Sequence, residues 1–195
     1  MFSIQNSVFN AFERIFSIDY RTLALFRVIF GLLIVLDLLL RSRDFSAFFT
    51  DEGVIPRELA MNWWGENTFS LYFINGGPLF TGGLTILAGL AALALALGYK
   101  TRIAAVISWL MLVSLHQRTG ILSSGADDLL RVLGFWAMFL PLGARYSLDA
   151  AMERASSSAD CQRGISPKAS YFSLATFAML MQVMYVYWVG ALLKT

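Results

Sequence analysis

Long apolar runs separated by short polar connections make up most of this chain. A helix needs about 20 mostly apolar residues to cross about 30 Å of hydrocarbon. Five runs meet or approach that length, and two of them, the third and the fourth, need flanking residues to cross fully. The pattern predicts an all-α, polytopic transmembrane bundle with about five spans, at roughly residues 20–40, 78–97, 103–116, 127–142 and 170–193.

The segments between the spans have patterns of their own. Residues 1–17 alternate apolar and polar positions at helical spacing, which predicts an amphipathic helix in the membrane interface. Asp19 is the expected N-cap of the first span, and Pro56 is expected to begin a short helix in an interfacial loop. Residues 143–169 lose the apolar pattern and gain charge and serine, which indicates a cytoplasmic loop.

Composition agrees with a membrane protein. The chain is 57% hydrophobic and 14% charged, with a mean hydropathy of +0.64 and a net charge of +2, whereas soluble domains average about 25% charged residues. No basic stripe suggests a nucleic-acid partner. With Cys161 and His116 the single residues of their types, a conventional His/Cys zinc site cannot form, and we expect no metal.

Lysine and arginine are more numerous in the segments that would lie inside if the N-terminus is cytoplasmic. The expected location is therefore an integral membrane protein with a cytoplasmic N-terminus, in the inner membrane if the cell is bacterial. With this orientation, ionisable side chains from four spans lie near the outer face: Asp37, His116, Asp127, Asp128, Arg131 and Lys194. Such residues usually face the bundle interior and pair with one another.

Each of these residues has a structural and a functional interpretation. Asp127 and Asp128 are spaced to pair with Arg131 on one helix face, which would simply neutralise the arginine. Arg27 lies about ten residues deeper than Asp37 and needs a partner on another helix. His116 is expected to be an interfacial hydrogen-bonding residue rather than a catalyst.

Lys194 and the aromatic residues before it also have two interpretations. Lys194 either extends to the headgroups or, when partly buried, becomes a usable base. Tyr187, with Tyr185 and Trp188, either belongs to an interfacial aromatic belt or lines a pocket for a flat ligand.

Six runs in this order resemble the horizontally transferred transmembrane domain (HTTM) family, whose membrane domain is shared with vitamin K-dependent γ-carboxylase. The resemblance covers nearly the whole chain. The runs are LALFRVIFGLLIVLD (23–37), TDEGVIPRE (50–58), LGYKTRIA (97–104), SLHQRTG with GADDLLR (114–131), FLPLGARYSLDA (139–150) and YVYWVGALLKT (185–195).

The resemblance implies a carboxylase or quinol-oxidising enzyme with lyase-type carbon–carbon chemistry. Its cofactor would be a reduced quinone similar to vitamin K hydroquinone, and its substrate a peptide or protein. The family's initiating lysine matches Lys194, and Asp127, Asp128 and Arg131 become candidate binding groups with His116, Asp37, Arg27 and Tyr187. The catalytic histidine of the eukaryotic carboxylases falls near residues 125–128, where this chain has none. The region that follows the lysine is also missing, so we expect a chain truncated at its C-terminus.

Two other classes of function remain open from the sequence. One is a non-catalytic membrane module that assists the maturation, export or immunity of a peptide, in which Lys194, Asp127 and Asp128 would tolerate substitution. The other is a small-solute transporter, for which buried charges are typical but inverted repeats are expected. Neither the substrate nor the oligomeric state follows from the sequence.

Overall fold

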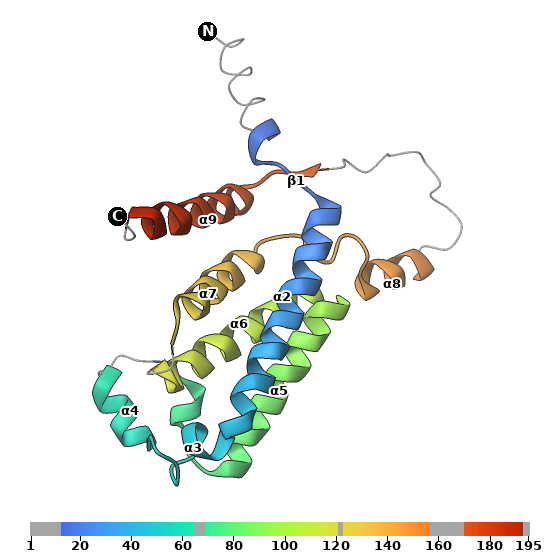
Figure 1. The fold of residues 1–195 in the computed structure, drawn as a ribbon. Helices are drawn as coiled ribbons and strands as arrows, with labels where there is room; N and C mark the ends of the chain where they lie inside the picture. Colours follow the sequence, from blue (N-terminus) through green and yellow to red (C-terminus); the bar gives the residue numbers. More distant parts are fainter. Residues whose placement is uncertain (1–12, 65–68, 121–122, 157–169, 193–195) are drawn as a thin grey trace.

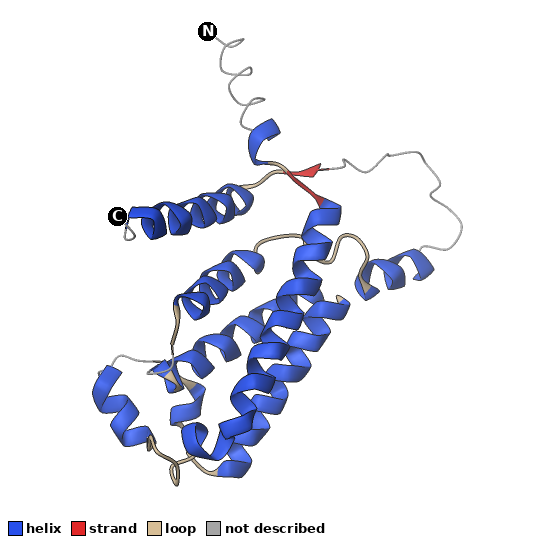
Figure 2. Ribbon diagram, viewed as in Figure 1, coloured by secondary structure: helices blue, strands red, loops and turns tan. Residues whose placement is uncertain are grey.

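The computed structural model describes residues 13–64, 69–120, 123–156 and 170–192, and these residues form a mostly helical protein (Figures 1 and 2). Two very short strands are the exception. The elements in chain order are β1 (Ile18–Asp19), α2 (Tyr20–Arg41), η1 (Ser42–Asp44), α3 (Phe45–Phe49), α4 (Arg57–Trp64), η2 (Leu71–Phe73), α5 (Pro78–Leu97), α6 (Thr101–Arg118), α7 (Gly125–Ala137), α8 (Leu148–Ser156), β2 (Ser170–Tyr171) and α9 (Leu174–Leu192).

Helices α2 and α5 pack against each other along the bundle, as Figure 1 shows. Asp19 caps α2 by accepting a hydrogen bond from the backbone N–H of Arg21 at 2.7 Å, as its position predicts. Glycine allows the close contact between the helices, because a Cβ at Gly31 would lie 2.8 Å from the carbonyl oxygen of Ala92. The apolar sequence of both helices therefore becomes a tight interhelical contact on one side.

Helix α5 has the ends that its sequence predicts. Pro78 occupies the first turn, where its missing N–H costs nothing, and Gly98 ends the helix with a φ of +75°. The chain then reverses into α6, which packs on α5, while α7 packs on α6 and α9 on α7. The C-terminal ends of α2 and α6 and the N-terminal end of α7 consequently meet at one end of the bundle.

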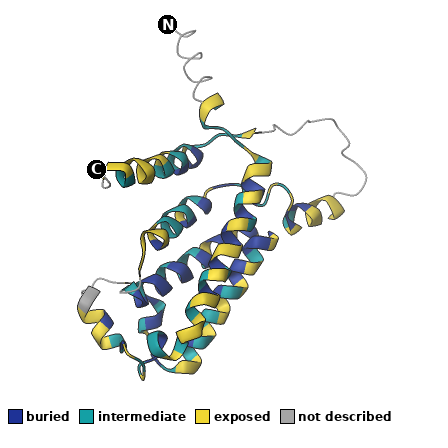
Figure 3. Cartoon of the chain, viewed as in Figure 1, coloured by how far each residue is buried: buried dark blue, intermediate teal, exposed yellow. Residues whose placement is uncertain are grey.

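Among the described residues, three helical segments are long and apolar enough to cross a membrane: Tyr20–Phe49, Pro78–Leu97 and Leu174–Leu192. Many residues of these helices are exposed, as Figure 3 shows. The exposed residues include leucines, which suits contact with lipid. Helix α6 is less apolar and does not belong to this set. Helix α7 starts and ends earlier than residues 127–142 and, with 13 residues, extends only about 20 Å. A membrane-spanning helical protein is thus supported, and five separate spans are not established.

The C-terminal part of the structure differs from the prediction in two places. Residues 143–169 were expected to be a loop, but residues 148–156 form α8, with Asp149 in its first turn. The last span was expected to begin at residue 170, yet Ser170 and Tyr171 form a strand that pairs antiparallel with Asp19 and Ile18. Backbone pairing with β1 takes these two residues out of the helix, which begins at Leu174.

The N-terminal interfacial helix predicted over residues 1–17 falls mostly outside the described residues. Within the described part, residues 13–16 are helical. The ring of Phe16 packs edge-on against that of Phe177 in α9, with centroids 4.8 Å apart. This contact, like the strand pairing, links the beginning of the described chain to its last helix.

Candidate functional site

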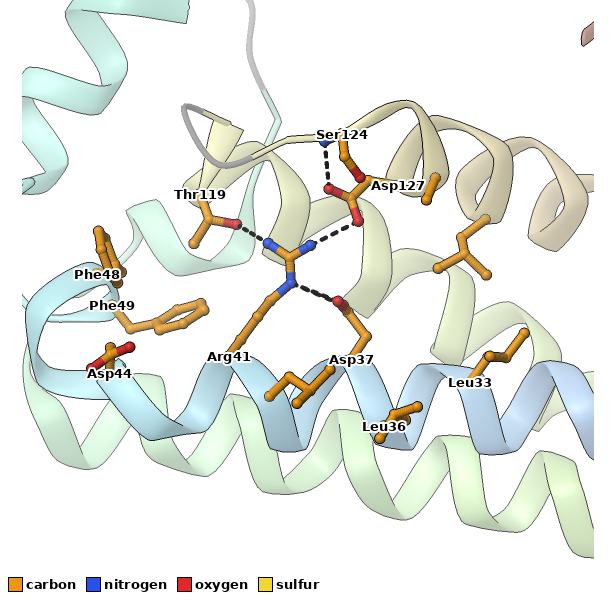
Figure 4. Close-up of a pocket in the computed structure, with 13 residues that line it drawn as sticks. Leu33, Leu36, Asp37, Arg41, Asp44, Phe48, Phe49, Thr119, Ser124 and Asp127 are labelled. Atoms are coloured by element: carbon orange, nitrogen blue, oxygen red, sulfur yellow. Dashed lines mark hydrogen bonds and ion pairs between the residues drawn. The ribbon is translucent and has the colours of Figure 1, made fainter.

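A group of ionisable side chains lies where α2, α6 and α7 meet. Arg41, in the last turn of α2, donates from Nε to Asp37 Oδ1 at 2.8 Å and from Nη2 to Asp127 Oδ1 at 2.7 Å. Its Nη1 donates to the hydroxyl of Thr119 at 3.1 Å, so the guanidinium joins all three helix ends (Figure 4). We call Asp37, Arg41, His116 and Asp127 the Arg41 cluster.

The helix ends explain why these residues occupy these positions. A cation in the last turn of a helix and an anion in the first turn both interact favourably with the helix dipole, which suits Arg41 in α2 and Asp127 in α7. Asp127 is also the third residue of a capping box, because its Oδ2 accepts from the backbone N–H of Ser124 at 2.8 Å. Asp127 therefore uses Oδ2 to cap the helix and Oδ1 to bind Arg41.

His116 completes the cluster from α6. Its side chain is fully buried, and its Nε2 lies 3.3 Å from Asp37 Oδ2 and 3.6 Å from Asp127 Oδ1. Two facing carboxylates favour the tautomer with the hydrogen on Nε2. Among the described residues, Nδ1 has no hydrogen-bond partner.

The cluster contains more negative than positive charge when His116 is neutral, since two carboxylates face one guanidinium. The side chains of Arg41, Asp37 and Asp127 are 15%, 18% and 6% exposed. Charges this well buried are expensive unless they are paired and fully hydrogen-bonded. The arrangement favours anything that brings positive charge or hydrogen-bond donors to these oxygens.

A cavity of about 540 Å³ lies beside the cluster. Its polar lining residues are Asp37, Arg41 and Asp127 together with Asp44, Thr119 and Ser124. The rest of the wall is mostly apolar and comes from α2, α3 and α7: Leu33, Leu36, Leu40, Phe48, Phe49, Ala126 and Leu130. Leu33, Leu36 and Leu40 are also exposed on the outside of α2, a segment long enough to span a membrane. The cavity lining thus combines charged side chains with leucines that are exposed on a helix long enough to span a membrane.

Asp128 and Arg131 form their own ion pair, spaced i,i+3 on α7. This is one of the two pairings that the spacing predicts, and Asp127 does not take part in it because it is turned toward Arg41. Asp128 is largely exposed, with 67% of its side chain accessible. The pair consequently lies outside the cluster.

The remaining predicted residues lie elsewhere. Tyr187 is on α9 and is 77% exposed, so it contributes nothing to the cavity beside Arg41. Lys194, the candidate base, lies outside the described residues. Arg27 is on α2, as predicted, but its hydrogen-bond partners lie in the segment between α7 and α8 rather than on another helix.

Arg27 is buried against the segment before α8. Its Nη1 donates to the carbonyl of Leu142 at 3.0 Å and its Nη2 to the carbonyl of Tyr146 at 2.6 Å. Gly98, which has a positive φ, lies against the guanidinium of Arg27, since a Cβ at this position would come within 2.6 Å of Nη1. This contact set, which we call the Arg27 clamp, holds the α5–α6 turn against residues 142–146.

Asp149 extends the clamp to the start of α6. Its carboxylate accepts from the backbone N–H groups of Lys100 and Thr101 at 2.7 and 2.8 Å and from the Thr101 hydroxyl at 2.6 Å. Burial by itself would raise the pKa of Asp149, but these hydrogen bonds and the charge of Arg27 outweigh it and lower the pKa below its usual value. The carboxylate therefore stabilises the fold in its ionised form.

Sequence reasoning missed Arg41, Thr119 and Ser124 as members of the site. Arg41 lies one residue beyond the first predicted span, which ends at about residue 40, yet its spacing of i+4 from Asp37 indicates an ion pair on one helix face. The same spacing could have identified it. Thr119 and Ser124 have no comparable signal, because their roles depend on how α6 and α7 meet.

Comparison with protein-family models, with curated proteins and with solved structures finds no match to this chain. Function is therefore inferred from the residues and from the geometry of the Arg41 cluster.

Proposed function

We propose that this chain is an integral membrane protein of the HTTM type that binds a lipid-soluble ligand with a hydrogen-bonding headgroup, namely a reduced quinone, in the cavity beside Arg41. One observation supports this most: the cavity lining combines charged side chains with leucines exposed on α2, a helix long enough to span a membrane. Ligand sites are typically apolar pockets with a few well-placed polar groups.

The residues fit a reduced quinone chemically. Each hydroxyl of such a ring donates a hydrogen bond, and the carboxylates of Asp37 and Asp127 are acceptors with excess negative charge. Leu33, Leu36 and Leu130 would contact the ring or its apolar tail. Asp37 and Asp127 would hold the headgroup, with Arg41 orienting both carboxylates.

The resemblance to the carboxylase membrane domain extends the proposal to catalysis. A reduced quinone supplies, when bound, the reducing equivalents for reaction with oxygen. Lys194 is then the candidate base that removes the hydroxyl proton, and a peptide or protein is the candidate substrate. The role of Lys194 is based on the resemblance alone.

The finer topology belongs to the same proposal. Helices α6 and α7, completed by flanking residues, would cross the membrane with α2, α5 and α9, which makes five spans. The excess of lysine and arginine in the inner set supports a cytoplasmic N-terminus. The cavity would then open near the outer face.

A non-catalytic module is the second candidate, and one observation favours it. Arg41 already pairs with both Asp37 and Asp127 and bonds Thr119, which is what a purely structural link between three helices would do. In that case the cluster stabilises the bundle and the cavity holds lipid without selectivity.

Binding of a reduced quinone to two matched leucine variants separates these candidates. Leu36 lines the cavity and Leu32 does not, yet the two are 51% and 52% exposed on the same helix. The purified full chain in nanodiscs would be equilibrated with a reduced naphthoquinone, and the bound quinol would be extracted and quantified. Leu36→Trp should weaken binding at least about tenfold, comparable to losing the apolar contacts of one side chain, while Leu32→Trp should leave it unchanged.

Equal binding by both variants would contradict a site in this cavity. Oxidation of the quinol by Lys194→Ala then tests the catalytic extension separately. Retained binding with lost oxidation supports Lys194 as the base, and retained oxidation removes that role.

A further inference from the structure

We infer that Asp37, His116 and Asp127 form a binding site for a divalent transition-metal cation such as Zn²⁺, and that Arg41 occupies the place of this cation when no metal is bound. The inference goes beyond the proposed function and does not depend on a quinone in the cavity. It uses Asp37 and Asp127, which line the cavity, and His116, which is buried beside them.

The positions of the donor atoms support a metal site. One ligand atom from each of Asp37, His116 and Asp127 lies within 4.8 Å of the other two. Two ligands bound to Zn²⁺ at about 2.0–2.1 Å with tetrahedral separation are about 3.4 Å apart. The distances from His116 Nε2 to the two carboxylate oxygens are 3.3 and 3.6 Å, so a small movement of the side chains suffices.

The donor types fit as well. One imidazole with two carboxylates is a mixed nitrogen and oxygen set, which suits zinc and its neighbours in the first transition row. The chain's lack of a second histidine excludes a His/Cys zinc site but not this combination. Three protein ligands leave a fourth position, and the cavity beside Asp37 and Asp127 gives that position room for water or a ligand atom.

The charge and burial of the cluster support a metal site independently of the donor distances. His116 is fully buried and directs Nε2 at both carboxylates, and the cluster has one uncompensated negative charge when this ring is neutral. A divalent cation would be attracted to these oxygens much more strongly than a hydrogen-bond donor, because attraction grows with charge in a poorly solvated site.

Arg41 must leave for the metal to bind, and the structure offers it another partner. Asp44 lies three residues further along the chain and lines the same cavity (Figure 4). Arginine has a long flexible side chain, and an exposed pair of this spacing is a common arrangement. Movement of the guanidinium to Asp44 would free Asp37 and Asp127 for the cation, and the hydrogen of the His116 ring would move from Nε2 to Nδ1 so that Nε2 can bind the metal.

Calorimetric titration of Zn²⁺ into the purified full chain tests the site. The protein should carry a tag without histidine and the Cys161→Ser substitution, so that His116 is the single imidazole and no thiolate competes. We expect saturable binding of one ion per chain. His116→Ala and Asp127→Asn should each weaken it at least about tenfold, the smallest loss typical even of residues that only support a ligand.

The matched control is Asp128→Asn, which removes an exposed carboxyl of the same helix and should leave the affinity unchanged. Absence of saturable binding to the unsubstituted cluster would overturn the inference. So would an affinity that is the same in the His116→Ala protein, because the metal would then bind elsewhere.

Arg41→Gln gives the most specific test because it should improve binding. Removing the competing cation should tighten Zn²⁺ binding by roughly tenfold or more, whereas a purely structural Arg41 would give weaker or unchanged binding when it is removed. Asp44→Asn should act in the opposite direction and weaken Zn²⁺ binding, since the displaced guanidinium loses its alternative partner. Unchanged or weaker binding by a folded Arg41→Gln protein would contradict the exchange between Arg41 and the metal.

One measurement does not depend on whether these variants fold. Copper(II) binds nitrogen and oxygen sites more tightly than zinc does, and pulsed electron paramagnetic resonance detects the remote nitrogen of a copper-bound imidazole. Because His116 is the only histidine in the sequence, this signal in the otherwise unsubstituted chain would identify it as a ligand. Bound copper without the signal would overturn the site.

Discussion

Helix α2 contains a buried arginine, Arg27, and a partly buried one, Arg41, and the two have different partners. Arg27 is 1% exposed and donates to two backbone carbonyls, those of Leu142 and Tyr146. Arg41 pairs with the carboxylates of Asp37 and Asp127 and borders a cavity of about 540 Å³. Arginine thus has a structural role at position 27. At position 41 it belongs to a cluster of ionisable groups in which the two carboxylates outnumber the guanidinium.

The difference shows how to separate structural from functional charge in a membrane protein. The two acceptors of Arg27 are carbonyl oxygens, which cannot change protonation state. Carboxylates and an imidazole next to a cavity can exchange partners, and their net charge depends on what they bind. Burial alone would rank Arg27 as the stronger candidate for function, whereas the chemistry of the partners favours Arg41.

Loss of the clamp should have the largest effect on stability. Arg27→Met keeps most of the side-chain volume but leaves the carbonyls of Leu142 and Tyr146 without donors in a buried site, which should cost about 3 kcal/mol. Thermal unfolding of the purified protein in detergent measures this. Arg21→Met, an exposed substitution on the same helix, should change stability by less than about 0.5 kcal/mol, and an equal effect of both would remove the distinction.

Gly98→Ala should destabilise the same region by about 2 kcal/mol. The residue has a φ of +75°, and a Cβ would come within 2.5 Å of Ser147 and 2.6 Å of Arg27. Gly83→Ala is the matched control, because no atom lies within 4 Å of a Cβ placed there. Since Gly83 is inside α5, this control should raise the unfolding temperature slightly, and a loss of stability in both variants would mean that steric contact is not the cause.

Asp127→Asn should have a moderate effect on stability and a large one on the cavity. Arg41 keeps Asp37 but loses a charge-assisted hydrogen bond, which should cost about 1.5 kcal/mol. Binding of the reduced quinone should fall at the same time, as the equilibrium assay described above would show. A protein with normal quinol binding and reduced stability would make the Arg41 cluster structural, like the clamp.

The smallest effect should appear only at low pH. The pKa of Asp149 is lowered in the folded protein, so its contribution to stability is fully present above the unfolded value of about 3.8 and is lost as the pH falls through the folded pKa. Asp149→Asn should therefore be less stable than the parent at neutral pH, and the gap should close in acid. Glu153→Gln on the same helix is the control, and a gap that stays constant with pH would contradict the role of the ionised carboxylate.

Much of the fold could be predicted from local sequence. Asp19, Pro78 and Gly98 mark helix ends through capping and backbone geometry, which depend on few neighbours. The end of α7 and the start of α9 could not be predicted in this way. Strand pairing of Ser170 with a residue 151 positions earlier in the chain is a tertiary contact that no local pattern shows.

The site could be predicted in part for the same reason. Depth along the spans places Asp37, His116 and Asp127 near one another, but only the packing of α2, α6 and α7 decides which groups touch. Asp127 has two possible partners by spacing, and the structure pairs it with Arg41 rather than Arg131. Distances between helices, and not the residues themselves, were the missing information.

The two-residue ladder between β1 and β2 has a consequence for membrane topology. Helix α2 begins directly after β1 and α9 begins shortly after β2, so both helices start from one place. If both cross a bilayer, they enter it from the same side. The chain from Tyr20 to Ser170 must then cross an even number of times, so two crossings or four are allowed and three are not. For helices that both cross the bilayer, the pairing of two residues on each strand thereby requires an even number of crossings between Tyr20 and Ser170.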